Sequence, residues 1–192
     1  MPSKKKLENT INIPNALTLL RFILTFVLLG MFIFDFPVLI IMYTFIFAAI
    51  TDFLDGQIAR GFRQVTKFGA KFDVIADRML WITTGLCLLI FFPLRGIFDS
   101  SQLLQMALIM TREILCAPFT LINLSKHEKV LVPARWSGKI TTFLQGFAIP
   151  AVILSVYYPY FDMSIILAVI TSLFGVWAAT EYIPNIGFFK KK

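Results

Sequence analysis

Long, continuous runs of apolar residues dominate the sequence, and short polar or proline-containing segments separate them. Apolar and polar positions do not alternate within the runs, which favours helices over the strands of a barrel. Several runs approach the roughly 20 residues that a helix needs to cross about 30 Å of hydrocarbon. The pattern predicts an all-α, polytopic integral membrane protein with six transmembrane helices, at residues 15–34, 37–60, 68–92, 102–124, 138–157 and 163–183.

Composition agrees with this class, because 58% of the residues are hydrophobic and the mean hydropathy is +0.79. These values are too apolar for a soluble domain of ordinary composition. The sequence has no internal repeat and no low-complexity segment, so we expect a single domain over residues 1–192, in which residues 1–14 form a basic juxtamembrane segment. The first apolar run ends without a small-residue cleavage site, so we do not expect a removable signal peptide.

The basic residues predict the orientation of the chain. If both termini lie on one side of the membrane, all 18 Lys and Arg residues except Arg95 fall in the half of the protein on that side. The positive-inside rule makes this side, and therefore both termini, cytoplasmic. The net charge of +7 then forms a surface layer, in which Lys4–Lys6 and Lys190–Lys192 suit anionic lipid headgroups. Nucleic acid is a poor explanation of the charge in so apolar a chain.

Four aspartates stand between two apolar runs, in the stretch from Thr51 to Asp77. Asp52 and Asp55 are three residues apart, and Asp73 and Asp77 are four apart, so each pair shares a helix face. A connection of about seven residues makes the two helices antiparallel neighbours, so the two faces can meet. The spacing predicts that four carboxylates converge in one pocket.

Four negative charges in such a pocket need compensation, since each costs roughly 2.5 to 3.5 kcal/mol at membrane depth. Arg60, Arg63, Lys67 and Lys71 are available, but the first three lie toward the connection. Hard oxygen ligands suit Mg²⁺, Mn²⁺ or Ca²⁺, and the sequence has no Cys/His cluster that indicates zinc. The carboxylates therefore predict divalent metal, with two ions a plausible number.

Small residues accompany the aspartates and leave room for a substrate beside the predicted metal. Mg²⁺ usually keeps coordination positions for water and substrate phosphate. Two-metal sites stabilise the attacking and leaving oxygens of a displacement at phosphorus. Gly56, Ala59, Gly69 and Ala70 remove side-chain bulk where a nucleotide or diphosphate can approach the backbone. The alternative is that they only allow close helix packing, as small residues do in membranes.

In order, the stretch reads DxxDGxxAR, eight residues, G, three residues, D, three residues, D. This pattern resembles the signature of the CDP-alcohol phosphotransferase family, with its fixed positions at Asp52, Asp55, Gly56, Ala59, Arg60, Gly69, Asp73 and Asp77. Members of that family displace CMP from a CDP-linked donor with an alcohol hydroxyl. They are generally homodimers with an interfacial site on the cytoplasmic side, and the resemblance extends to six membrane helices.

The resemblance implies a role for each signature residue. The four aspartates are expected to bind two Mg²⁺ or Mn²⁺ ions on the donor diphosphate, and Asp77 is also the candidate base for the acceptor hydroxyl. Gly56, Ala59, Arg60 and Gly69 are expected to shape the CDP site, with Arg60 as the phosphate partner.

Shorter segments resemble one branch of the family. "NIPNALTLLR" at 12–21, "REI" at 112–114, "SGKITT" at 137–142 and "EYI" at 181–183 look like phosphatidylglycerophosphate synthases. Those enzymes join CDP-diacylglycerol to sn-glycerol 3-phosphate. This chain departs from their pattern in the segment at 137–142, where they more often have a second Lys at the position of Thr141. The alternative is a CDP-alcohol-type cardiolipin synthase, which takes phosphatidylglycerol as acceptor, or another CDP-alcohol phosphotransferase.

An acceptor phosphate requires cations to bind it. Arg112 is the first candidate, because it is a charged residue that interrupts the fourth apolar run. Adjacent helical residues project about 100° apart, so we expect Arg112 and Glu113 to be poor partners. The alternative for Arg112 is a structural pair with Asp77 or Glu181. Lys139, at the start of the fifth helix, is the second candidate for the acceptor phosphate.

Arg21 is the third acceptor candidate, and it can reach either a lipid phosphate or one of the aspartates. Asn15 and Thr18 lie on its side of the first helix and predict a polar stripe. Arg135 and His127 are interpreted as part of the solvated basic layer.

A function of another class, cation transport, also uses intramembrane carboxylates. Transport requires polar residues along the outer halves of the second and third helices, which are almost purely apolar here, so we rank it low. The cysteines, Cys87 and Cys116, lie in apolar runs without CxxC spacing and are interpreted as reduced packing residues.

Overall fold

The computed structural model describes residues 13–62, 67–116, 136–158 and 163–182. Within these ranges, the side chains of residues 13–15, 52–62, 67–71, 73, 74 and 182 lie outside the description. All regular structure in the described ranges is helical, which confirms the all-α prediction for this part of the chain. The chain divides into two compact units, residues 1–87 and 88–192.

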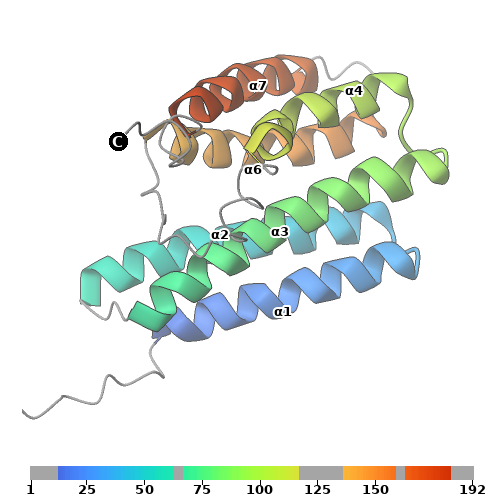
Figure 1. Cartoon of the computed structure of the whole chain (residues 1–192). Helices are drawn as coiled ribbons and strands as arrows, with labels where there is room; N and C mark the ends of the chain where they lie inside the picture. Colours follow the sequence, from blue (N-terminus) through green and yellow to red (C-terminus); the bar gives the residue numbers. More distant parts are fainter. Residues whose placement is uncertain (1–12, 63–66, 117–135, 159–162, 183–192) are drawn as a thin grey trace, which may run out of the picture. The chain divides into compact units, whose positions relative to one another are not determined.

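The first unit contains α1 (Ile13–Ile33), α2 (Val38–Phe62) and most of α3 (Lys67–Leu94). α1 and α2 pack side by side, drawn in blue and cyan in Figure 1. Their connection is a tight turn, in which the amides of Phe34 and Phe36 donate to the carbonyls of Gly30 and Met31, at 2.9 and 3.0 Å. Asp35 sits there at φ 59°, a conformation that short polar residues tolerate.

The core of the first unit is aromatic and aliphatic, with Leu28, Phe32, Ile41, Phe45 and Leu80 almost fully buried. Two ring contacts join α3 to the other helices. The Phe22 and Phe72 rings lie 5.4 Å apart, and the Phe45 and Trp81 rings lie 5.5 Å apart in an edge-on arrangement. These contacts attach α3 to both α1 and α2.

The second unit contains the end of α3, α4 (Ser100–Ile109), α6 (Trp136–Ser155) and α7 (Met163–Tyr182). α6 and α7 pack together, and α4 packs on both (Figure 1). α4 starts with a capping box, because Asp99 accepts from the Gln102 amide while the Gln102 side chain accepts from the Asp99 amide. Gly96, at φ 66°, allows the preceding turn.

Five of the six predicted helices match α1, α2, α3, α6 and α7, with ends that differ by no more than two residues. The fourth prediction, one helix over 102–124, was wrong in its continuity. α4 ends at Ile109, Met110 has φ −82° and ψ 7°, and helix resumes at 111–116, beyond which 117–124 lie outside the description. An apolar run carries no marker of such an interruption, because the hydrophobic pattern continues through Met110.

In the described residues, four helices are long and apolar enough to cross a membrane, at Ala16–Ile33, Ile75–Leu94, Trp136–Ser155 and Met163–Glu181. A shorter apolar helical segment among the described residues is Val38–Thr51 of α2. Membrane crossing by six helices and the cytoplasmic position of both termini remain predictions.

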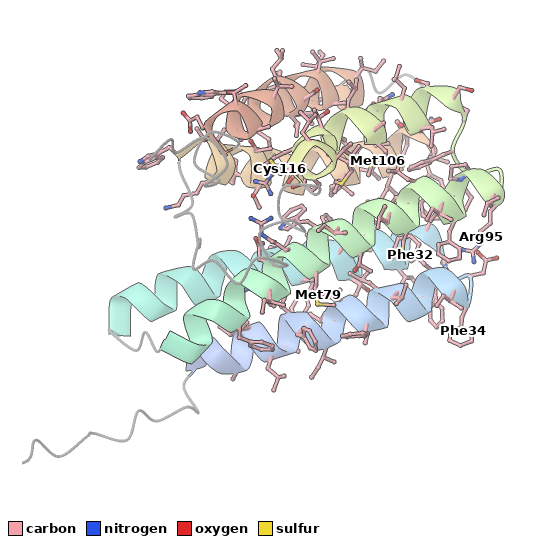
Figure 2. The ribbon with its side chains drawn as sticks, in the orientation of Figure 1. Phe32, Phe34, Met79, Arg95, Met106 and Cys116 are labelled. Atoms are coloured by element: carbon pink, nitrogen blue, oxygen red, sulfur yellow. The ribbon has the colours of Figure 1, made fainter. Side chains whose placement is uncertain are left out.

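Large apolar side chains cover the outside of the helices, as expected for contact with lipid. On α1, Leu19, Ile23 and Phe26 are about half exposed. Figure 2 shows Phe34 pointing away from the helices of its unit, where it is 77% exposed, whereas Met106 of α4 is fully buried. Burial therefore follows helix contacts and not polarity.

Candidate active site

The backbone places the two aspartate pairs at matching positions. Asp52 lies ten residues before the last residue of α2, and Asp77 lies ten residues after the first residue of α3. At 1.5 Å per residue, both are about 15 Å along their helices from the connection. Asp55 and Asp73 are likewise at about 10 Å. Equal distances from a short connection are what two facing pairs of carboxylates require.

Most side chains of the predicted metal and CDP sites lie outside the description. These are Asp52, Asp55, Gly56, Ala59, Arg60, Gly69 and Asp73. The side chains that the structure describes form no group of three or more His, Cys, Asp or Glu residues suited to a metal ion. Since three of the four predicted ligands fall outside that set, convergence of the carboxylates remains a prediction.

Asp77 is the one predicted ligand whose side chain is described, and it is partly buried. The indole Nε1–H of Trp81, one turn later on α3, donates a hydrogen bond to Asp77 Oδ1 at 2.8 Å. Trp81 is only 3% exposed and packs edge-on against the buried Phe45 ring of α2. Sequence reasoning missed Trp81, although a hydrogen-bond donor four residues after a candidate base is a recognisable signal.

The predicted polar stripe on α1 is buried. Thr18 is 3% exposed and Arg21 is fully buried, and Thr25 extends the stripe by one turn, with its hydroxyl bonded to the Arg21 carbonyl at 2.9 Å. The side chain of Asn15 lies outside the description. A fully buried Arg within apolar helices requires acceptors or negative charge nearby.

Arg112, in the second unit, is held from two sides. Its Nε and Nη2 bind Glu113 Oε1 at 2.9 and 2.7 Å, and its Nη1 donates to Gly138 O and Thr142 Oγ1, both at 2.9 Å. The expectation that Arg112 and Glu113 are poor partners was wrong. Both side chains are long enough to bridge the angle between neighbouring helical positions, and the α6 acceptors hold the other edge of the guanidinium group in place.

Further hydrogen bonds join this pair to α6, and join α6 to α7. Gln145 is fully buried, and its Nε2 donates to Glu113 Oε2 at 2.7 Å and to Ile109 O at 3.0 Å. Glu181, the alternative partner considered for Arg112, accepts a hydrogen bond from Ser137 at 2.7 Å. We call these six residues the polar cluster: Arg112, Glu113, Ser137, Thr142, Gln145 and Glu181.

The polar cluster brings together residues from three segments that the sequence marks as motifs, "REI", "SGKITT" and "EYI". It also contains Gln145, which sequence reasoning missed. A lone Gln inside the apolar run "FLQGF" was the available signal, because an amide buried among helices requires partners.

The contacts leave Arg112 little capacity for a ligand. Four of its five N–H groups have acceptors in the described part of the protein, and Glu113 offsets its charge. The two side chains are 21% and 12% exposed. Arg112 can therefore offer a phosphate one further N–H group without rearrangement.

Lys139, the other acceptor candidate of the second unit, is exposed on the first turn of α6. Its Nζ lies 5.7 Å from the centroid of the Trp136 ring, which is itself 80% exposed. Arg135 and His127 lie outside the described residues. Both cysteines are buried and carry free thiols, in agreement with the packing interpretation.

Comparison with known proteins identifies the family. Residues 11–177 match the CDP-alcohol phosphatidyltransferase family, a range that contains every predicted site residue. The chain belongs to this family. As a CDP-alcohol phosphatidyltransferase it is an enzyme, and its apolar helices make it an integral membrane protein.

This CDP-alcohol phosphatidyltransferase is similar to curated bacterial proteins. A CDP-diacylglycerol–glycerol-3-phosphate 3-phosphatidyltransferase of Rickettsia typhi is 37% identical over 156 residues, which cover 74% of this chain and 76% of the relative. A probable phosphatidylglycerophosphate synthase of Mycobacterium tuberculosis is 31% identical over 179 residues, covering 91% and 81%. A protein of Yersinia pestis with the same name as the first is 29% identical over 178 residues, covering 90% and 93%.

We expect substitution of Gly175 by Ala to destabilise the second unit. A Cβ at this buried position of α7 lies 3.3 Å from the amide nitrogen of Arg112 and 3.5 Å from its Cβ, so one backbone must move. Overpacking of this kind costs roughly 1 to 3 kcal/mol. Thermal unfolding in detergent measures the loss, which should appear as a lower melting temperature.

The matched control is Gly30→Ala, also within a helix, where an added Cβ meets nothing within 4 Å. Ala there should leave stability unchanged or raise it by roughly 0.5 to 1 kcal/mol, as expected for Gly to Ala within a helix. Equal melting temperatures for the two variants would contradict the close approach of α7 to Arg112.

Proposed function

We propose that this protein transfers a phosphatidyl group from CDP-diacylglycerol to sn-glycerol 3-phosphate, releasing CMP and forming phosphatidylglycerophosphate. The observation that carries the proposal is the similarity, at 31 to 37% identity over most of the chain, to relatives named for this synthesis. The family signature from Asp52 to Asp77 supports it from the sequence. The cardiolipin alternative has no comparable support among these relatives.

The reaction is a displacement at phosphorus. The acceptor hydroxyl forms a bond to the phosphorus that carries the diacylglycerol, and the bond from that phosphorus to the CMP oxygen breaks. The hydroxyl loses its proton, and we propose Asp77 as the base that takes it. Since a carboxylate is a weak base, its effect depends on holding an oxygen within hydrogen-bond distance of the hydroxyl.

The donor set of Asp52, Asp55, Asp73 and Asp77 fits divalent metal. Four carboxylates supply the hard oxygens that Mg²⁺ and Mn²⁺ prefer, and their matching positions along α2 and α3 suit two ions between the helices. When bound, two such ions would offset negative charge on the diphosphate and on the leaving oxygen.

The remaining signature residues suit the nucleotide. Gly56, Ala59 and Gly69 lie within the helical segments that carry the aspartates, where a missing or small side chain permits close approach of the CDP group. We propose Arg60 as the partner of a donor phosphate, since a guanidinium group can bind two phosphate oxygens at once.

Arg21 lies at the level of the aspartates. Arg21 lies twelve residues before the end of α1, and Ile50 lies twelve residues after the start of α2. Because the two helices run in opposite directions from a short turn, Arg21 is level with Ile50 and therefore within one helical turn of Asp52. Its complete burial fits an ion pair with a carboxylate of the first unit better than direct contact with the acceptor phosphate, the other role predicted for it.

For the acceptor phosphate we propose Lys139 as the principal cation, because its ammonium group is exposed at the start of α6. Arg112 would add one N–H group, held in position by Glu113 and α6. From the distribution of basic residues we propose that Lys139 lies at the cytoplasmic face, in a protein with six membrane-crossing helices and both termini inside. A homodimer is the expected assembly from the family resemblance.

The proposed reaction predicts acceptor-dependent release of CMP. Purified protein with CDP-diacylglycerol and Mg²⁺ or Mn²⁺ should release CMP with sn-glycerol 3-phosphate and not with phosphatidylglycerol or with glycerol lacking the phosphate. Chromatography of the lipid product provides a second measurement. Release with phosphatidylglycerol alone would establish the cardiolipin alternative, and no release with any alcohol would reject the proposed reaction.

Lys139→Ala should raise the KM for glycerol 3-phosphate by about tenfold, while the KM for CDP-diacylglycerol changes less than twofold. One lost charge-assisted contact at the lower end of the usual range, roughly 1.5 kcal/mol, corresponds to a change of this size. Arg95→Ala is the control, because Arg95 stands over the Phe91 ring at the end of α3 and is predicted to lie on the opposite side. Equal increases in both KM values would contradict the placement of Lys139.

A further inference from the structure

The hydrogen bond between Trp81 and Asp77 places an aromatic donor next to the proposed base. The Nε1 to Oδ1 distance is 2.8 Å, and the donor lies one helical turn beyond the carboxylate on the same helix. The indole is almost completely removed from solvent, at 3% exposure. A buried N–H bonded to a carboxylate is a charge-assisted bond, which is stronger and more directional than a bond between neutral groups.

We propose that Trp81 is a positioning residue for catalysis, which fixes the orientation of the Asp77 carboxylate by donating a hydrogen bond to Oδ1. This inference rests on the proposed function, in which Asp77 acts as base and metal ligand. A carboxylate can rotate about the bond to its Cβ, so a fixed first oxygen determines the direction of the second. Partners of this kind orient the groups that bind metal and substrate.

The surroundings of Trp81 make it a rigid support. The Phe45 ring of α2 meets the indole edge-on, with 5.5 Å between centroids and 82° between ring planes, and Phe45 is fully buried. Phe45 lies two turns before Asp52 on the same helix. Trp81 therefore links the helix of Asp52 and Asp55 to the carboxylate of Asp77, so that it can fix the register of α2 against α3 as well.

The alternative is that Trp81 has only a structural role. Its ring would then fill space between α2 and α3, and its hydrogen bond to Asp77 would serve only to satisfy the buried N–H group. The two roles differ in what the N–H group does. If the role is packing, an isostere without the N–H should behave like the natural protein. If the role is positioning, loss of the N–H alone should weaken metal binding and turnover while the fold persists.

The test uses full-length protein with two substitutions of Trp81, Trp81→Phe and replacement by benzothienylalanine, in which sulfur replaces the N–H with nearly the same ring shape. Mn²⁺ affinity is measured by electron paramagnetic resonance without substrates, and kcat and KM by CMP release. We expect the Mn²⁺ Kd to rise about tenfold and kcat to fall about tenfold in both variants, as for loss of other partners of metal ligands. The acceptor KM should change less than twofold.

Trp177→Phe is the matched control, since this α7 residue is 48% exposed and contacts Phe174 with its ring. It should leave Mn²⁺ affinity and kcat unchanged. If the benzothienylalanine protein has the same Mn²⁺ affinity and the same kcat as the protein with Trp81, the positioning role is overturned. This holds even if Trp81→Phe lowers the melting temperature. Natural protein that binds Mn²⁺ but releases no CMP would reject the proposed reaction, while the Mn²⁺ measurement would still test Trp81. If the natural protein binds no Mn²⁺, both the positioning role of Trp81 and the proposed metal-dependent reaction are overturned.

Discussion

Negative charge within apolar helices is the constraint on which the rest of this protein depends. Four aspartates occur within 26 residues at adjoining ends of α2 and α3, in a chain whose composition is that of a membrane protein. Carboxylates are expensive in such surroundings unless cations or donors accompany them. Trp81 of α3 supplies a donor to Asp77, and we propose the fully buried Arg21 of α1 as a cation for the same group of carboxylates.

The second unit uses polar groups differently. Its polar cluster joins the helical turn after α4 to α6 through hydrogen bonds of Arg112, Glu113 and Gln145, and it joins α6 to α7 through the bond from Ser137 to Glu181. Helices in lipid gain little from apolar contact with one another, so polar bonds and small residues determine how they pack. The close approach of Gly175 to the Arg112 backbone belongs to the same pattern.

The sequence predicted what depends on hydrophobic pattern and local spacing. Five helices agree closely with the structure, and the aspartates lie on the helices expected for them. The interruption at Met110 was not predictable, because apolarity continues through it. The pairing of Arg112 with Glu113 was misjudged because the angle between adjacent positions ignores side-chain length. Gln145 and Trp81 were missed although each carried a local signal, because their burial depends on tertiary contacts, with packed helices for Gln145 and with the Phe45 ring for Trp81.

The proposed transfer depends on divalent cations held by the aspartates of α2 and α3. Counting Mn²⁺ bound per chain, by electron paramagnetic resonance on purified protein with CDP-diacylglycerol, tests it most directly. Two ions per chain are predicted for the natural protein, as in other two-metal sites, and fewer for an Asp52→Asn, Asp73→Asn double variant that still folds. If the natural protein binds no Mn²⁺, or if the folded variant binds the same number of ions, the aspartates do not hold the cations.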